Sequence, residues 1–383
     1  MSNDISKRIS STALAFRGYN VTNLGKTPEL LKHSAYGPTV AQFLKQASEI
    51  CADVTHCKVD LARRVRKRQN TSLRTYAQAI SLVVGTELAQ VRLLEEFFGV
   101  SLTDVQLAFG YSLGEVAALV AGGVYDMETA LTPLLVLAKD AAELASNVTM
   151  GVLFSRGPAL DCDAVRRLCL EISNCGRGVI GVSSYLSPNT VLLLGQGRTV
   201  DRFKRMMHGV LAKPVHIRKN PNRWPPMHTP LVRQRNISNR AGVMLDTAKG
   251  GFTAPVPPVL SCVTGDASYN DYNSRELLVR WIDHPQRLWD VIDKVLAAGI
   301  TTIIHVGPEP NIIPATFNRL CNNVTAQLSG YSLSGFGLRA ISHIVRRPRP
   351  WLTSLLFSDA TLLRAPFVEQ IILEDWLLQQ QVN

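Results

Sequence analysis

The stretch Val105-Gln106-Leu107-Ala108-Phe109-Gly110-Tyr111-Ser112-Leu113-Gly114 decides how this 383-residue chain is expected to fold. Its first half, Val105–Phe109, is a short apolar run typical of a buried strand. An Ala-rich helical pattern begins near Leu113, so the sequence predicts a strand, a tight turn and a helix. Ser112 stands in that turn between Gly110 and Gly114. Small residues two before and two after the serine suit a sharp turn that pushes the hydroxyl group out of the fold.

A Gly-x-Ser-x-Gly turn between a strand and a helix is typical of a nucleophile elbow. The backbone N–H of the residue after the serine, here Leu113, then points at the oxygen that gains charge during acyl transfer. The N-terminus of the following helix adds a favourable dipole. The pattern alone is weak, and its alternative interpretation is a glycine-bracketed turn with a structural serine. The flanking strand and helix favour the elbow.

Residues 12–325 resemble the malonyl-CoA:acyl-carrier-protein transacylases and the acyltransferase domains of polyketide synthases. The elbow is similar to the family's GHSLGE signature. The other matching segments are Ala117-Ala118, Ala121–Val124, Met227–Leu231, Pro258–Ser261 with Val263–Gly265, Val306–Pro308 with Glu309 in place of a glycine, and Phe16, Gly18 and Gly25 from the family's FPGQGSQxxGM segment.

The resemblance implies an α/β fold in which an α/β-hydrolase-like large subdomain carries an inserted ferredoxin-like α+β small subdomain. The large subdomain would comprise residues 12–149 and 213–325. The insertion would comprise residues 150–212, where β-like runs alternate with helical segments in a β-α-β-β-α pattern. Residues 326–383 have no counterpart in the family and are expected to form a basic, helical C-terminal extension.

The resemblance also implies the catalytic groups. Ser112 would be the nucleophile, and His228 would be its general base and later its general acid. A backbone carbonyl, that of Trp281, would orient the histidine, in preference to the nearby Asp283. The oxyanion hole would be formed by the backbone N–H groups of Leu113 and Tyr19.

The substrate pocket implied by the resemblance includes Tyr111, Leu137 and Met227. Leu137 stands 25 residues after the serine, where malonyl-specific members have an arginine that binds the free carboxylate of the substrate. Lys139 would face away, because two residues along a helix turn about 200°. We therefore expect an acyl group without a free carboxylate. The alternative is that Leu137 is a core residue and that Arg223 supplies the missing cation.

Helical periodicity predicts a helix over residues 72–99, interrupted at Gly85. Asp126 is predicted to cap the next helix, and Pro133 to kink or restart it with Thr132 as a new cap. Four prolines predict a loop over Lys219–Pro230, and a helix and a strand are expected at Leu288–Ala298 and Thr302–Val306.

The composition favours a folded protein: 46% of residues are hydrophobic and 19% are charged. We expect no membrane span, because no apolar run reaches 18 residues, and no secretory signal precedes the body of the chain. Seven cysteines without a CxxC pair predict free thiols in a reducing cytoplasm and no metal site.

The net charge of +11 is concentrated in two clusters, Arg63–Arg68 and Arg346–Arg349. These clusters are either solvated loops or attract an anionic partner. Because aromatic residues are not interleaved with the basic ones, nucleic acid is disfavoured. Coenzyme A and an acidic carrier protein fit the charge equally well.

These observations predict an acyltransferase of fatty-acid or polyketide biosynthesis. It would move an acyl group from acyl-CoA or an acyl carrier to the thiol of an acyl carrier protein, with acyl-CoA as a substrate and with no bound cofactor. Two alternatives remain open. An acyl-thioester hydrolase of the same fold would use the same Ser112 and His228. A non-enzymatic interaction subunit is suggested by the substituted N-terminal loop, where Tyr19, Asn20 and Val21 replace family residues.

Overall fold

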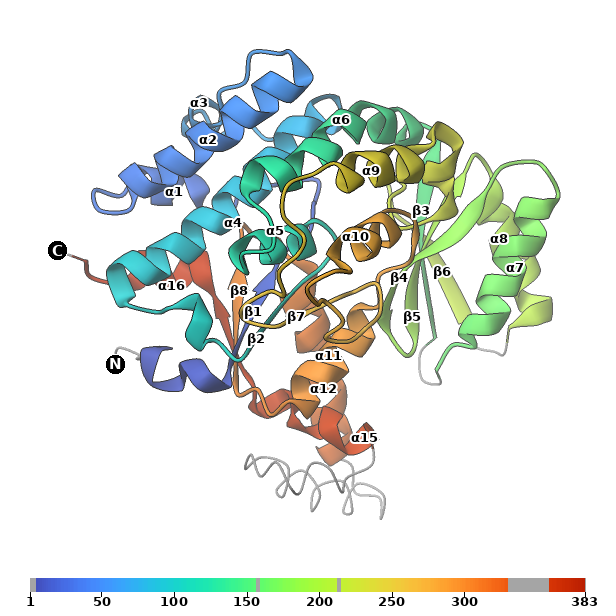
Figure 1. Ribbon diagram of the computed structural model, residues 1–383. Coiled ribbons are helices and arrows are strands. Elements are labelled where there is room, and N and C mark those ends of the chain that lie inside the picture. The colour runs from blue at the N-terminus through green and yellow to red at the C-terminus, as the bar shows by residue number, and fades with distance from the viewer. Residues whose placement is uncertain (1–4, 156–158, 212–214, 330–357, 383) are drawn as a thin grey trace.

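The computed structural model describes residues 5–155, 159–211, 215–329 and 358–382 of the chain. Its central layer is a five-stranded sheet with the strand order β7-β2-β1-β8-β9, in which every neighbouring pair is parallel. Figure 1 shows this sheet between layers of helices. The predicted α/β class is therefore confirmed. The strands are β1 Thr12–Phe16, β2 Leu107–Gly110, β7 Val259–Leu260, β8 Thr302–Val306 and β9 Glu369–Ile372.

Strand β1 is buried on both faces, as expected for the middle of a parallel sheet. Leu14 and Phe16 pack into one hydrophobic core, and Ala13 and Ala15 pack into another. Helices α2 Gly37–Thr55, α4 Tyr76–Phe98, α5 Leu113–Ala121, α6 Met127–Ala145, α9 Ile237–Asp246 and α10 Ser274–Asp283 contribute to the first core, and α11 Leu288–Ala297 and α12 Ile312–Ser329 to the second. The shorter helices are η1 Ile5–Ser11, α1 Thr27–Lys32, α3 Leu61–Arg66, η2 Leu73–Thr75, η3 Leu102–Asp104 and η4 Pro230–Arg235.

A second, antiparallel sheet has the strand order β4-β5-β3-β6 and lies beside the first (Figure 1). Two helices cover one of its faces and share a core with it. Its other face contributes Leu186 and Leu192 to the core that contains α11. The elements follow one another as β3 Val148–Ser155, α7 Cys162–Asn174, β4 Ile180–Ser187, β5 Thr190–Gln196, α8 Thr199–Val210 and β6 Val215–Lys219.

Strand β6 was not expected from the sequence, which placed the end of this unit at residue 212. It is a short strand at the edge of the sheet that pairs with β3, directly before the proline-rich loop. Its partly exposed residues alternate apolar Val215 and Ile217 with polar His216 and Arg218. Such a brief alternation carries little sequence signal beside four prolines.

The predicted interruption of the helix at Gly85 is wrong, because α4 is continuous from Tyr76 to Phe98. Gly85 instead allows two helices to approach each other. A Cβ atom on Gly85 would lie 3.0 Å from the Cβ atom of Ala47 on α2. The glycine thus serves the packing of α2 against α4 rather than a break in α4.

Pro133 does not restart the helix, since α6 runs unbroken from Met127 to Ala145. Asp126 caps its N-terminus as predicted, and its carboxylate accepts the Thr129 N–H at 2.6 Å. Thr132 does not start a new helix; its hydroxyl donates to the carbonyl of Glu128, one turn earlier.

The C-terminal segment is more than the helical extension that was expected. After α15 Ser358–Thr361 and η5 Leu362–Phe367, it adds strand β9 to the edge of the parallel sheet and ends in α16 Leu373–Gln379. Glu374 is 1% exposed, and its carboxylate accepts the backbone N–H groups of Lys26 at 2.8 Å and Glu309 at 2.9 Å. The segment therefore links the loop after β1 to the turn after β8. The predicted basic cluster Arg346–Arg349 lies outside the described residues.

None of the helices within the described ranges is long and apolar enough to cross a membrane. All seven cysteines belong to these ranges and are free thiols. The basic cluster Arg63–Arg68 lies on and after α3, where Arg68 pairs with Glu29.

Candidate active site

The Gly-x-Ser-x-Gly stretch forms the sharp turn that the sequence predicts. Ser112 joins β2 to α5 with φ 55° and ψ −120°, a strained backbone conformation for a residue other than glycine. A Cβ atom on Gly110 would lie 2.0 Å from the carbonyl carbon of Gly114, and one on Gly114 would lie 2.2 Å from the carbonyl oxygen of Phe16. Both glycines are therefore required by close backbone approach.

Glu115 joins the first turn of α5 to the segment that contains Ser261 and Tyr269. Its buried carboxylate accepts hydrogen bonds from the Ser261 hydroxyl and the Tyr269 hydroxyl, both at 2.6 Å, and from the Cys262 N–H at 3.0 Å. Burial raises the pKa of Glu115 to about 7, against the lowering effect of these hydrogen bonds. This network joins the segment around Ser261 directly to the elbow.

His228 lies against the serine. The Ser112 Oγ atom is 2.7 Å from His228 Nε2, and His228 Nδ1 is 2.6 Å from the carbonyl oxygen of Trp281. Because a carbonyl oxygen can only accept, Nδ1 carries the proton of the neutral ring and Nε2 presents a lone pair to the hydroxyl. The ring is 4% exposed, and this burial lowers the pKa of His228 to about 4, against the raising effect of the Trp281 carbonyl. The imidazole is therefore neutral and basic at neutral pH.

Trp281 contacts both His228 and Ser112, whereas the sequence resemblance implied only its contact to His228. Besides its carbonyl contact to His228, its indole N–H donates to the Ser112 carbonyl at 3.0 Å. The two rings meet edge to face, with centroids 4.8 Å apart. Asp283, the less favoured candidate to orient the histidine, pairs instead with Arg233 and His284.

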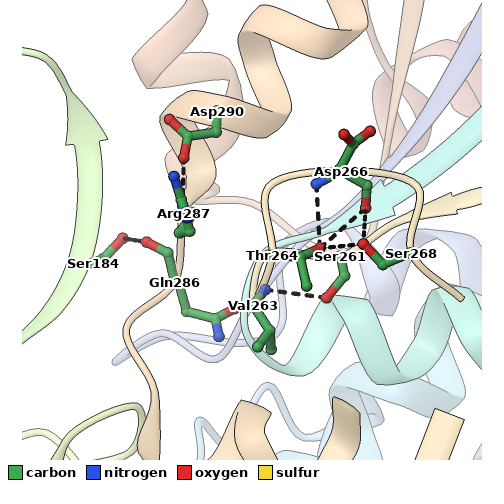
Figure 2. Close-up of polar contacts among 9 residues, drawn as sticks. All are labelled: Ser184, Ser261, Val263, Thr264, Asp266, Ser268, Gln286, Arg287 and Asp290. Atoms are coloured by element: carbon green, nitrogen blue, oxygen red, sulfur yellow. Dashed lines mark hydrogen bonds and ion pairs between the residues drawn. The ribbon is translucent and has the colours of Figure 1, made fainter. Parts of the chain in front are cut away.

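Gln286 is a further contact of the elbow that sequence reasoning missed. Its buried side chain accepts the Ser112 N–H at 3.2 Å, while its backbone binds strand β4 through the Ser183 carbonyl at 2.9 Å and the Ser184 hydroxyl at 3.2 Å. Figure 2 shows the Ser184 contact and the Gln286 side chain turned away from that strand. Gln286 thus couples the antiparallel sheet to the nucleophile turn. A glutamine after a proline gives no signal of this in the sequence.

The two predicted oxyanion-hole donors are the backbone N–H groups of Leu113 and Tyr19. Within the described part of the chain, neither the Leu113 N–H nor the Tyr19 N–H donates to a protein acceptor. The loop that carries Tyr19 touches the elbow directly. A Cβ atom on Gly18 would lie 2.6 Å from the Tyr111 carbonyl oxygen and 3.2 Å from the Ser112 Cβ atom.

A cavity of about 500 Å³ opens over Ser112 and His228. Strands β3 and β5 form one wall and α12 forms another, so the cavity lies between the two sheets and their helices. Tyr111 and Met227, two of the residues predicted for the substrate pocket, line it. Its lining within the described residues contains one permanently charged side chain, Arg319, which sequence reasoning missed.

A smaller cavity of about 30 Å³ lies on the other side of Ser112. Leu137, which is 3% exposed, lines it together with Met227, and none of its described lining residues is charged. Arg223 does not reach it. That guanidinium donates to the Val148 carbonyl at 2.9 Å.

The chain is similar to known proteins in both sequence and structure. No family model matches the chain. Malonyl CoA-acyl carrier protein transacylase of Haemophilus influenzae is 24% identical over 299 residues, which are 77% of this chain and 88% of that protein. The enzyme of the same name from Bacillus subtilis is 22% identical over 223 residues, 57% of this chain and 65% of that protein.

Solved structures give the same result for the fold. The structure of MCAT from Streptococcus pneumoniae has a TM-score of 0.64 and 22% identity, covering 80% of this chain and 92% of the other. The malonyl CoA-acyl carrier protein transacylase of Coxiella burnetii has a TM-score of 0.64 and 21% identity, covering 82% and 91%. A type II polyketide synthase acyl-carrier protein in complex with its malonyl-transacylase matches with a TM-score of 0.59 and 21% identity over 80% and 92%. The chain is thus similar in sequence to malonyl CoA-acyl carrier protein transacylases, and it shares the fold of their solved structures.

Proposed function

We propose that the chain is an acyltransferase that moves an acyl group from acyl-CoA or an acyl carrier to the thiol of an acyl carrier protein. The observation that carries this proposal is the 2.7 Å contact between Ser112 Oγ and the unprotonated Nε2 atom of His228, at the base of a cavity. The names of the two curated relatives support the carrier-protein substrate.

In the first half-reaction, Ser112 Oγ attacks the thioester carbonyl carbon while His228 Nε2 takes the hydroxyl proton. The carbonyl oxygen becomes an oxyanion that the Leu113 and Tyr19 N–H groups stabilise. When the carbon–sulfur bond breaks, the leaving thiolate takes the proton from His228. The acyl group remains on Ser112 as an ester.

The second half-reaction repeats these steps in reverse order with the carrier thiol. His228 takes the thiol proton, the sulfur attacks the ester, and Ser112 recovers its proton. If water attacks instead, the outcome is hydrolysis, which is the second candidate function. The apolar lining of the small cavity favours transfer, because water is poorly held beside the ester.

We infer that the acyl group is short and lacks a free carboxylate, unlike the malonyl group in the relatives' names. The small cavity has room for only a few atoms and offers no cation to a carboxylate. An unpaired buried charge costs several kcal/mol, whereas an apolar group gains about 0.8 kcal/mol per buried CH₂. Leu137 would contact the tip of the acyl chain.

The pantetheine arm, common to coenzyme A and carrier proteins, would lie along α12 in the large cavity. Ala315 and Arg319 lie four residues apart on one face of α12, Asn311 directly precedes that helix, and all three line the cavity. The Asn311 side chain is 8% exposed, and its Nδ2 atom has no acceptor among the described residues. It can donate to an amide carbonyl of the arm, and Arg319 can bind a phosphate.

We also interpret the two sheets as an α/β-hydrolase-like large subdomain, 12–149 and 213–325, and a ferredoxin-like small subdomain, 150–212. The β-α-β-β-α-β succession of the smaller unit supports this, provided that β6 is added to it. Residues 326–383 would remain a separate extension that supplies β9. Free cysteines support work in a reducing cytoplasm, in fatty-acid or polyketide biosynthesis.

Intact-protein mass spectrometry after mixing with acetyl-, hexanoyl- and malonyl-CoA in competition tests the proposal. We expect one acyl adduct, on Ser112, that is discharged faster by a carrier thiol than by water. Its absence from every incubation would favour the non-enzymatic interaction subunit, and discharge independent of thiol would favour the hydrolase. Preferential malonylation of wild type would contradict the inferred specificity, whereas a swing to malonyl only in Leu137→Arg would support it.

A further inference from the structure

Arg17 is a fully buried arginine between β1 and the loop that carries Tyr19. Its Nε atom donates to the Gly18 carbonyl at 2.7 Å, one Nη2 hydrogen donates to Asn23 Oδ1 at 2.9 Å, and Nη1 donates to the Pro308 carbonyl. A single guanidinium therefore joins both ends of the loop to the turn after β8. The planar fork of an arginine suits such a role, which a lysine cannot reproduce.

The charge of Arg17 is retained in this buried position. Desolvation lowers the pKa of Arg17 to about 10, while the carboxylates of Glu87, Glu309 and Glu374 raise it. The group is thus protonated at neutral pH. Four hydrogen bonds, the fourth from Nη2 to the Thr22 carbonyl at 3.5 Å, and the facing acidic groups offset the cost of removing the cation from water.

Asn23 closes the loop above the guanidinium. Its Oδ1 atom accepts the Asn20 N–H at 3.0 Å and its Nδ2 atom donates to the Asn20 carbonyl at 2.7 Å. Since Arg17 also binds Asn23 Oδ1, residues 18–23 form one hydrogen-bonded unit around Arg17. That unit rests on the elbow, because Gly18 lies against Tyr111 and Ser112.

The Gly18–Tyr19 peptide connects Arg17 to the Tyr19 N–H, which is the proposed oxyanion donor. In a trans peptide the C=O and N–H bonds lie in one plane and point in opposite directions. Because Arg17 Nε holds the Gly18 carbonyl, the Tyr19 N–H is turned away from the guanidinium and is left without a protein acceptor in the described part of the chain.

We propose that Arg17 is a positioning residue for acyl transfer: it fixes the Gly18–Tyr19 peptide so that the Tyr19 N–H faces the oxyanion formed over Ser112. The inference rests on the proposed function. It gives the substituted N-terminal loop a means of holding an oxyanion donor that does not depend on a glycine at position 20. The donor acts on the transition state, so its loss lowers turnover and leaves substrate binding intact.

The test compares Arg17→Met and Arg17→Lys with wild type in single-turnover acylation of Ser112 by the preferred acyl-CoA. We expect the acylation rate to fall, by up to the roughly 100- to 1,000-fold that loss of a whole oxyanion donor costs. The dissociation constant of a non-reactive thioether analogue should change less than about threefold, since it forms no oxyanion. The affinity of a trifluoromethyl ketone that forms a tetrahedral adduct with Ser112 should fall in parallel with the rate.

The matched control is Arg364→Met. Arg364 is 3% exposed and also binds backbone carbonyls, those of Leu296 and Ile300, but it does not line either cavity. It should lose stability as Arg17→Met does while its acylation rate remains near wild type. Arg17→Lys preserves charge and most of the volume, so it remains informative if Arg17→Met does not fold.

Two outcomes separate the hypotheses. If wild type forms no acyl-Ser112, the proposed function fails. If wild type is acylated and folded Arg17 variants acylate at the wild-type rate, or bind the thioether and the ketone equally weakly, the positioning role of Arg17 is wrong.

Discussion

The elbow at Gly110–Gly114 and the loop at Gly18–Lys26 face each other across the site, yet they are held in different ways. The elbow depends on steric fit, because Gly110 and Gly114 make room for a close approach of backbone that no larger residue allows. The loop depends on distant groups: Arg17 binds the Pro308 carbonyl, and Glu374 accepts the Lys26 N–H. The elbow thus requires glycine for steric reasons in addition to its polar contacts, whereas the loop is held by buried polar contacts.

This difference explains which side tolerates change. A steric requirement at a close backbone contact accepts only glycine, so the elbow keeps a recognisable pattern. A loop held by hydrogen bonds to its carbonyl and N–H groups can change its side chains, provided that a partner such as Arg17 remains. The two sides should therefore respond differently to substitution, in degree and in kind.

Gly110→Ala should have the largest effect, because the added Cβ atom would lie 2.0 Å from the Gly114 backbone. Overpacking typically costs about 1–3 kcal/mol, and here no flexible side chain can yield. We expect loss of both folded yield and acylation, measured by thermal unfolding and mass spectrometry. Gly209→Ala is the control, since a Cβ atom on Gly209 meets nothing within 4 Å. A stable, active Gly110→Ala variant would contradict the steric account.

His228→Ala should abolish most transfer without unfolding the protein. Loss of a general acid–base group typically costs about 100- to 10,000-fold. His305→Ala is a matched control, because His305 is also buried but bonds to Gln370 at 2.6 Å instead of to the serine. It should lower stability and retain turnover. Near-normal steady-state transfer by His228→Ala would remove His228 from the mechanism.

Glu374→Ala tests the loop side and should have an intermediate effect. It leaves the Lys26 and Glu309 N–H groups without their acceptor, and each unsatisfied group costs about 1–3 kcal/mol. We expect a lower midpoint in urea and a graded fall in turnover. Asp375→Asn is the control one residue further on, where the ion pair with Lys26 is exposed and should contribute little. Equal effects of the two substitutions would argue against a special role for Glu374.

The smallest expected effect is that of pH on kcat/KM. With the pKa of His228 lowered to about 4 by burial, nearly all of the enzyme retains the neutral base at pH 5.5, so the value there should lie within about twofold of that at pH 7.5. The unfolded chain, with an ordinary histidine pKa of 6.5, takes up the proton first as pH falls. The contribution of His228 to stability is therefore complete above pH 6.5 and is lost between pH 6.5 and 4. A fall in kcat/KM centred near pH 6.5 would show that the imidazole is hydrated.

The sequence was sufficient for features set by local pattern. Strand β2, helix α5 and the Asp126 cap follow from periodicity and residue type, and the family resemblance led to His228 and Trp281. It was insufficient where a residue acts through a distant partner. Gln286, Arg17 and Arg319 carry no local signal, because what each does depends on which backbone the fold brings beside it. The errors at Gly85 and Pro133 have the same origin: tertiary packing maintained helices that local propensity would interrupt.

The contact between Lys26 and Glu374 spans 348 positions in the chain, and this has a consequence for synthesis on the ribosome. The strands and helix that form the elbow are complete once residue 121 has emerged, apart from β7 and β8 at its sides. The loop opposite cannot be tied to α16 until residue 374 is made, because closing so long a segment must await both ends. A nascent or prematurely terminated chain thus presents its serine without the second half of the site.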